Sequence, residues 1–171
     1  MIKLLGAALV LAASCAFGAG GVLRLRRHAA QLRAFRRMTD VIRAELAFRL
    51  SPVPELLEKI AETCAEPASG FARSLLGALR SLGDEPFSEL WRRALLGRPQ
   101  LKLTNDELEP LVSLGQTLGR YDAESQLRSL GYAETRLDGY IARAERRCRD
   151  DSRLRAVGAL SVGVFIVIIL I

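Results

Sequence analysis

The chain has 171 residues, of which 50% are apolar and 26% are charged. An intrinsically disordered protein would contain fewer apolar residues, and three cysteines are too few for a disulfide-dense secreted scaffold. The mean hydropathy is above zero although the chain carries 25 basic and 19 acidic side chains. The apolar residues must therefore be concentrated in particular segments, and they lie at the two ends.

The first apolar run covers residues 4–23 and contains no charged side chain. About 20 apolar residues in a helix span the core of a bilayer, so residues 1–23 are predicted to form an N-terminal transmembrane helix. A cleaved signal peptide is the alternative, because the run follows Lys3 and because Cys15 lies in a sequence similar to a lipoprotein cleavage box. The arginines that follow at once favour a retained anchor, since positive charge holds its side of the segment in the cytoplasm.

The second apolar run covers residues 156–171 and is rich in valine and isoleucine. As a helix it would be about 24 Å long, slightly less than the bilayer core, and we predict a C-terminal transmembrane helix. A buried core helix is the alternative, but a run with no polar face would need covering on every side. Small residues recur every four positions in both runs, which either allows close packing of membrane helices or arises by chance in alanine-rich sequence. These candidate packing residues are Ala8, Ala12, Ala16, Gly20, Ala159 and Gly163.

Charge is unevenly distributed between the two runs. Residues 24–37 carry six arginines and no acid, and residues 143–155 carry six arginines and three acids. Residues 38–142 carry twelve basic and sixteen acidic side chains. The positive-inside rule therefore predicts that residues 24–155 lie in the cytoplasm and that both termini lie outside it. The excess positive charge lies where anionic headgroups attract it, so we expect a membrane partner and no nucleic acid. The first membrane-proximal basic residues are Arg24, Arg26, Arg27, Arg33, Arg36 and Arg37.

Residues 24–155 show helical spacing of apolar side chains throughout, which predicts a cytoplasmic bundle of six helices in an all-α protein. Proline and glycine end the successive helices at residues 51–54, 67–70, 83–86 and 97–99. Gly70 is expected to help end the second helix. The fifth helix carries an apolar stripe made of Leu108, Leu111, Val112, Gly115 and Leu118.

The fifth and sixth helices are expected to meet at a corner. Thr104 and Glu107 form a capping box at the start of the fifth helix, Gly119 occupies a left-handed C-cap position, and Asp122 caps the sixth helix. No proline follows Asp122, so the sixth helix is predicted to continue into the second apolar run. The corner is either a purely structural turn or also a partner contact. Its candidate residues are Gly115, Gln116, Gly119, Arg120 and Asp122.

The residue constellations that perform catalysis are missing from the sequence. His28 is the single histidine and lies in the first basic stretch, away from any candidate nucleophile. Cys15, Cys64 and Cys148 are dispersed and lack metal-ligand spacing. No lysine follows a glycine-rich loop, so the sequence contains no nucleotide-binding P-loop. We therefore predict that the protein is not an enzyme and that it needs no cofactor and no metal.

The sequence resembles the stage III sporulation protein AB family of endospore-forming bacteria. The resemblance covers residues 1–7, the arginine-rich helix, Glu45 leading to Ser51 and Pro52, residues 115–122 with Gln126, and the terminal apolar helix. The corner is similar, more faintly, to the membrane platform proteins of type II secretion and type IV pilus systems. Those proteins carry a Gly-Glu-x-x-Gly corner followed by an acidic residue, and Gln116 stands here in place of the glutamate.

The resemblance implies a cytoplasmic helical bundle on membrane anchors with a role in sporulation. Members of this family belong to a set of proteins that build a channel between mother cell and forespore, and they lie in the mother-cell membrane around the forespore. A sister protein in that set resembles a secretion ATPase. The expected function is a non-enzymatic platform that couples a cytoplasmic ATPase to the membrane complex. The alternative is a membrane-tethered adaptor or regulator with an unrelated partner, and self-association stays open.

Overall fold

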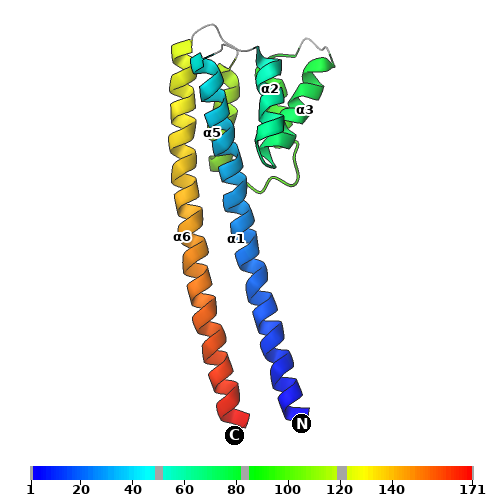
Figure 1. Ribbon diagram of the computed structural model, residues 1–171, viewed down its shortest axis with the longest axis vertical. Helices are drawn as coiled ribbons and strands as arrows, with labels where there is room; N and C mark the ends of the chain where they lie inside the picture. Colours follow the sequence, from blue (N-terminus) through cyan, green and yellow to red (C-terminus); the bar gives the residue numbers. More distant parts are fainter. Residues whose placement is uncertain (1, 49–51, 82–84, 119–122, 171) are drawn as a thin grey trace. The chain divides into compact units, whose positions relative to one another are not determined.

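The computed structural model describes residues 2–48, 52–81, 85–118 and 123–170, with side chains for residues 21–47, 52–81, 85–118, 124–151 and 158. These residues form helices and turns without any strand, which confirms the predicted all-α class. In chain order the helices are α1 (Ile2–Phe48), α2 (Val53–Thr63), α3 (Ala68–Arg80), α4 (Phe87–Leu96), α5 (Asn105–Thr117) and α6 (Ala123–Leu170), as Figure 1 shows.

The chain divides into two compact units, and the first and last helices contribute to both. One unit is Ala30–Ile141, and the other combines Met1–Ala29 with Ala142–Ile171. Helix α1 has 47 residues and α6 has 48, so α6 measures about 72 Å at 1.5 Å per residue. The prediction that the sixth helix continues into the second apolar run is confirmed.

Of the residues that the structure describes, no helical stretch is long and apolar enough to cross a bilayer. The transmembrane helices at residues 1–23 and 156–171, and the boundaries of the domain at residues 24–155, stay predictions.

Proline marks the start of three of the short helices. Pro52, Pro67 and Pro86 are the N-cap residues of α2, α3 and α4. A proline at this point fixes its own backbone near helical φ and pushes the preceding residue out of the helical region. These residues therefore separate consecutive helices where the sequence predicts breaks.

The expectation that Gly70 helps to end the second helix is wrong. Helix α2 ends at Thr63, and Gly70 lies in the first turn of α3. A Cβ at Gly70 would lie 2.9 Å from Cζ of Arg98, which is closer than carbon atoms approach one another. The glycine at this position therefore provides space for the Arg98 guanidinium.

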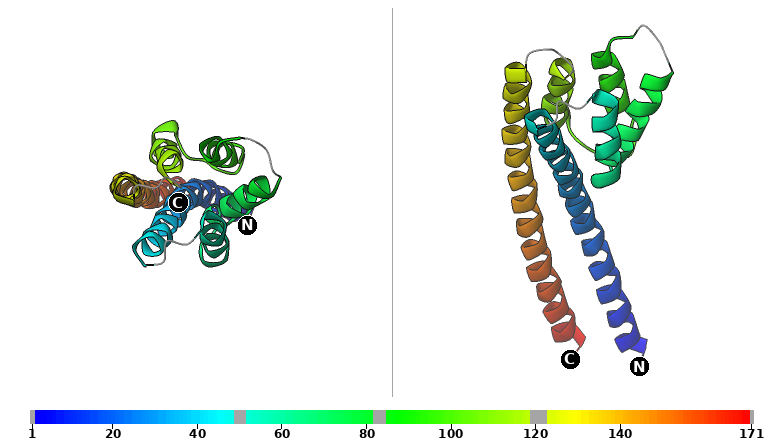
Figure 2. Two further views of the ribbon diagram at one scale, coloured as in Figure 1. Left: turned by 90° about the horizontal axis from the view of Figure 1, so that it is seen from above. Right: turned by 45° about the horizontal axis from the view of Figure 1, so that its top comes forward.

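The unit Ala30–Ile141 is built around an aromatic core. Seen from above in Figure 2, its helical segments follow one another in chain order around the centre, and α2, α3, α4 and α5 pack as consecutive neighbours. The ring of Phe71 meets the ring of Trp91 edge-on at 4.7 Å between centroids, and Phe35 approaches Phe71 at 6.3 Å. Phe35 and Phe71 are fully buried, so this row of rings ties α1, α3 and α4 together.

Helices α1 and α6 are joined within the same unit by ion pairs. Arg43 Nε donates to Glu134 Oε1 at 2.9 Å, and Arg36 Nε donates to Asp138 Oδ1 at 2.9 Å. Arg36 also pairs with Asp40 one turn along α1. The Glu134 side chain is only 13% exposed, so its charge-assisted hydrogen bond to Arg43 is partly shielded from water.

Candidate protein–protein interface

The candidate site is built on the contact between α4 and α5. Trp91 is 1% exposed, and its Nε1 donates to the carbonyl oxygen of Leu111 at 2.8 Å. Phe87 packs beside the same indole at 5.8 Å between ring centroids. A buried indole N–H that has a partner and aromatic neighbours is held in one orientation. This contact fixes which face of α5 turns inward and which face remains outside.

Gly115 allows this contact because it carries no side chain. A Cβ on Gly115 would lie 2.7 Å from Nε1 of Trp91, so the indole occupies the space above the glycine backbone. Gly115 lies inside α5, where the predicted apolar stripe placed it, and the sequence also made it a candidate residue of the corner that follows. Gly115 allows α4 and α5 to pack closely, and no local sequence motif predicts this contact.

The start of α5 is held by the capping box at Thr104 and Glu107. The Thr104 amide donates to Glu107 Oε2 at 2.8 Å, and the Thr104 side chain accepts from the Glu107 amide. Both amides thereby gain side-chain acceptors at the helix start, where regular helical acceptors are missing. Glu107 is 7% exposed, so this end of α5 is anchored to the bundle.

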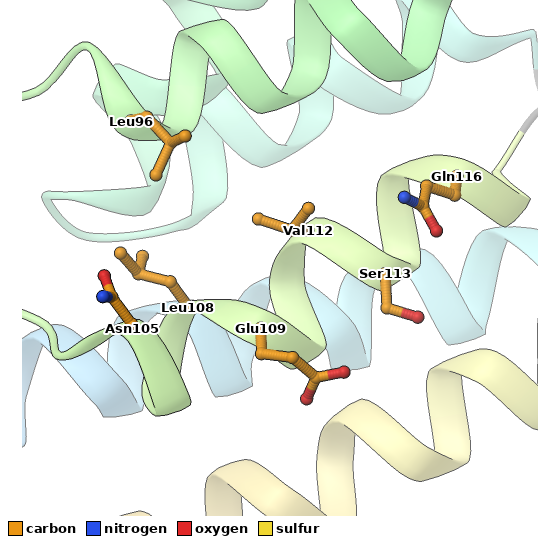
Figure 3. Close-up of a pocket in the computed structure, with 7 residues that line it drawn as sticks. All are labelled: Leu96, Asn105, Leu108, Glu109, Val112, Ser113 and Gln116. Atoms are coloured by element: carbon orange, nitrogen blue, oxygen red, sulfur yellow. The ribbon is translucent and has the colours of Figure 1, made fainter.

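The outward face of α5 carries a shallow pocket of about 340 Å³ (Figure 3). Its side chains recur every three or four residues along α5, and one residue at the end of α4 closes it. The lining residues are Leu96, Asn105, Leu108, Glu109, Val112, Ser113 and Gln116. Leu96 is 52% exposed, an unusual position for a large apolar side chain next to two others.

The predicted corner residues separate in the structure. Gly115 is buried under Trp91, whereas Gln116 is exposed and lines the pocket. Gly119, Arg120 and Asp122 lie outside the described residues, so their predicted roles stay predictions. The pocket itself was missed, because the sequence assigned Leu108 and Val112 to one continuous buried stripe.

The other predicted site residues lie on α1 and α6. Arg36 takes part in ion pairs inside the bundle, and the other basic residues of its stretch are exposed or partly exposed on α1. The exposed ones are Arg24, Arg26, Arg27, Arg33 and Arg37. The small residues of the two apolar runs, from Ala8 to Gly20 and at Ala159 and Gly163, are helical, and their side chains are outside the described set. Within the described part of the chain, no group of three or more metal-binding side chains gathers.

Tyr132 of α6 connects to the edge of the pocket. Its hydroxyl donates to Glu109 Oε2 at 3.0 Å. This hydrogen bond to a carboxylate raises the pKa of the Tyr132 phenol above its ordinary value of 10.0, because it stabilises the protonated form. Since the bond requires the phenol proton, it is present at neutral pH and is lost as the pH rises through the raised pKa.

We expect the substitution Glu109→Gln to lower the pKa of Tyr132 toward its ordinary value. The amide oxygen of glutamine can still accept the hydrogen bond, but it carries no negative charge to oppose ionisation of the phenol. Tyrosinate absorbance during alkaline titration of the full chain measures this, with Tyr132→Phe identifying the contribution of Tyr132. Identical titration of Tyr132 in both proteins would show that Glu109 does not hold the phenol in solution.

Comparison with known proteins agrees with the resemblance drawn from the sequence. Residues 3–171 match the family described as stage III sporulation protein AB. The chain is similar to stage III sporulation protein AB of Bacillus subtilis (strain 168), with 26% identity over 172 residues and 99% of each chain covered. It is also similar to a solved structure of stage III sporulation protein AB, with a TM-score of 0.62 and 28% identity over 70% of this chain and 94% of that chain. The chain therefore belongs to the stage III sporulation protein AB family.

Proposed function

We propose that this sporulation protein is a non-enzymatic platform, anchored in a membrane at both ends, that presents a helical bundle to the cytoplasm. In this proposal the bundle couples a cytoplasmic secretion-type ATPase to a channel complex between mother cell and forespore. The protein would lie in the mother-cell membrane that surrounds the forespore. Family membership supports the role in sporulation, and the remaining elements are our inference.

The observation that carries the proposal is the continuity of α1 and α6. Each helix contributes one part to the compact unit Ala30–Ile141 and continues as a single helix into the apolar end of the sequence. Arginine-rich stretches lie between the acidic part of the chain and both apolar runs. A folded unit, basic flanks and apolar runs in this order suit a protein that holds a domain at a membrane surface.

Reporter fusions at each terminus and within residues 24–155 test the topology. We expect a cytoplasmic signal from the inner fusions and an external signal from both termini, because positive flanks on both runs face the same compartment. The N-terminus of the mature protein is determined in parallel by mass spectrometry. A mature chain that begins at Cys15 would contradict the two-anchor arrangement, and so would termini on opposite sides.

Partner capture from sporulating cells after mild detergent solubilisation tests the coupling role. We expect the full chain to retain a secretion-type ATPase together with membrane proteins of the channel. Retention of an unrelated cytoplasmic protein without the ATPase would favour the alternative function as a membrane-tethered adaptor or regulator.

A further inference from the structure

The outward face of α5 combines apolar surface with a cavity, and both lie within the unit Ala30–Ile141. Leu108 and Val112 are partly exposed one turn apart, and Leu96 extends from the end of α4 toward the same space (Figure 3). The opposite face of α5 is used for packing against Trp91. The contact with Trp91 therefore leaves these outward apolar side chains partly exposed.

The charge of this face is negative. Asp106 and Glu109 are exposed on its first turns, and α5 contains no lysine or arginine from Asn105 to Thr117. Among the described residues Glu109 contacts the neutral phenol of Tyr132, and neither carboxylate forms an ion pair. The arginines of α4 do not neutralise this face, because each has its own acidic partner: Arg92 pairs with Glu89, and Arg93 pairs with Glu85.

From this combination we infer that the α5 face binds an amphipathic helix of a cytoplasmic protein partner. The helix places an apolar side chain between Leu96, Leu108 and Val112 and a lysine or arginine beside Glu109. The lining residues from Asn105 to Gln116 extend about 16 Å along α5, which matches the two to three turns that a helix uses in a groove. Basic residues on the partner complement the two carboxylates, whereas an acidic or neutral helix gains nothing from them.

This inference deepens the proposed function, because it rests on the existence of a cytoplasmic partner and assigns the surface that receives it. The occupant differs in chemistry from a lipid surface, which would be repelled by Asp106 and Glu109 when its headgroups are anionic. The basic stretches beside the apolar runs and the acidic α5 face therefore serve different partners.

Photo-crosslinking with the full chain in sporulating cells tests the assignment. A benzophenone amino acid replaces Val112 in the pocket, and in a matched control it replaces Glu62, which is exposed on α2. We expect at least fivefold more cross-linked product from position 112, and peptide sequencing should place it in a helical segment of another protein with basic residues one turn from an apolar residue. In the chain that carries the benzophenone amino acid at position 112, Glu109→Gln should lower the yield of cross-linked product about fivefold, whereas Glu62→Gln should leave it unchanged.

Several results would overturn the assignment. The first is a cross-link to a second copy of this chain, to lipid, or to a segment without basic residues. The second is an equal yield of cross-linked product from positions 112 and 62. The third is an unchanged yield in the Glu109→Gln variant when its melting temperature is also unchanged. If detergent capture retains the ATPase while position 112 yields no product with any protein, the α5 face is excluded and the platform function stands. If position 112 yields no product and detergent capture retains no cytoplasmic partner, both proposals fail.

Discussion

Gly115→Ala is expected to lower the free energy of unfolding by about 2 kcal/mol, although alanine is the better helix former. The added methyl group would lie 2.7 Å from Nε1 of Trp91, and the indole cannot move aside easily because it is 1% exposed and packs against Phe71 and Phe87. Any shift of the ring also disturbs its hydrogen bond to Leu111. Chemical denaturation of the full chain in detergent, followed by helical circular dichroism, measures the loss.

Gly77→Ala provides the matched control for this substitution. Gly77 also lies within a helix, α3, but a Cβ there would have no atom within 4 Å. The substitution should therefore stabilise the protein by about 0.5–1 kcal/mol through helix propensity alone. Opposite signs for the two substitutions identify the steric contact with Trp91 as the cause. A stabilising effect of Gly115→Ala would show that α4 and α5 are not as close as the structure has them.

Lys59→Met is expected to destabilise the bundle by about 2 kcal/mol. Lys59 of α2 pairs with Glu45 of α1, whose side chain is only 7% exposed. Removing the cation takes this ion pair away from a buried carboxylate, and breaking a fully buried ion pair costs about 3–5 kcal/mol. The lysine is itself 46% exposed, so water compensates part of the loss. The same denaturation experiment measures the effect.

Two further variants isolate the cost of burying the charge. The double substitution Glu45→Leu with Lys59→Met removes both charges and should recover most of the stability. Arg80→Met breaks an ion pair with Glu58 whose side chains are 77% and 55% exposed, and it should change stability by less than about 0.5 kcal/mol. If Lys59→Met were as mild as Arg80→Met, burial of Glu45 would not be the controlling factor.

Local signals in the sequence predict the backbone of this fold well. Pro52, Pro67 and Pro86 separate helices because proline restricts its own φ and its predecessor, and Thr104 with Glu107 marks a helix start through neighbouring groups alone. Each of these effects acts over a few residues, so it can be predicted from neighbouring positions in the sequence.

Contacts between distant residues cannot be predicted in the same way. The sequence places Gly115 on the stripe of the fifth helix and at the corner, but it does not show that Trp91 lies above it. The sequence likewise places Arg36 among several membrane-proximal charges, but it does not show that Asp138 pairs with it. The apolar stripe of α5 is wider than the part of the helix surface that is buried in the bundle. The spacing therefore identifies Leu108 and Val112 as apolar positions, but it cannot decide that they border a pocket.

The pairing of α1 with α6 has a consequence for synthesis on the ribosome. Arg36 and Asp138 are 102 residues apart, and Arg43 and Glu134 are 91 residues apart. At about 5–20 residues per second, α1 emerges roughly 5–20 s before the residues that pair with it. During this interval the neighbouring pairs α2 with α3 and α4 with α5 can form, whereas the contacts between α1 and α6 cannot. A nascent chain stalled before residue 123 should therefore remain a substrate for chaperones, and release of the stall should end that dependence.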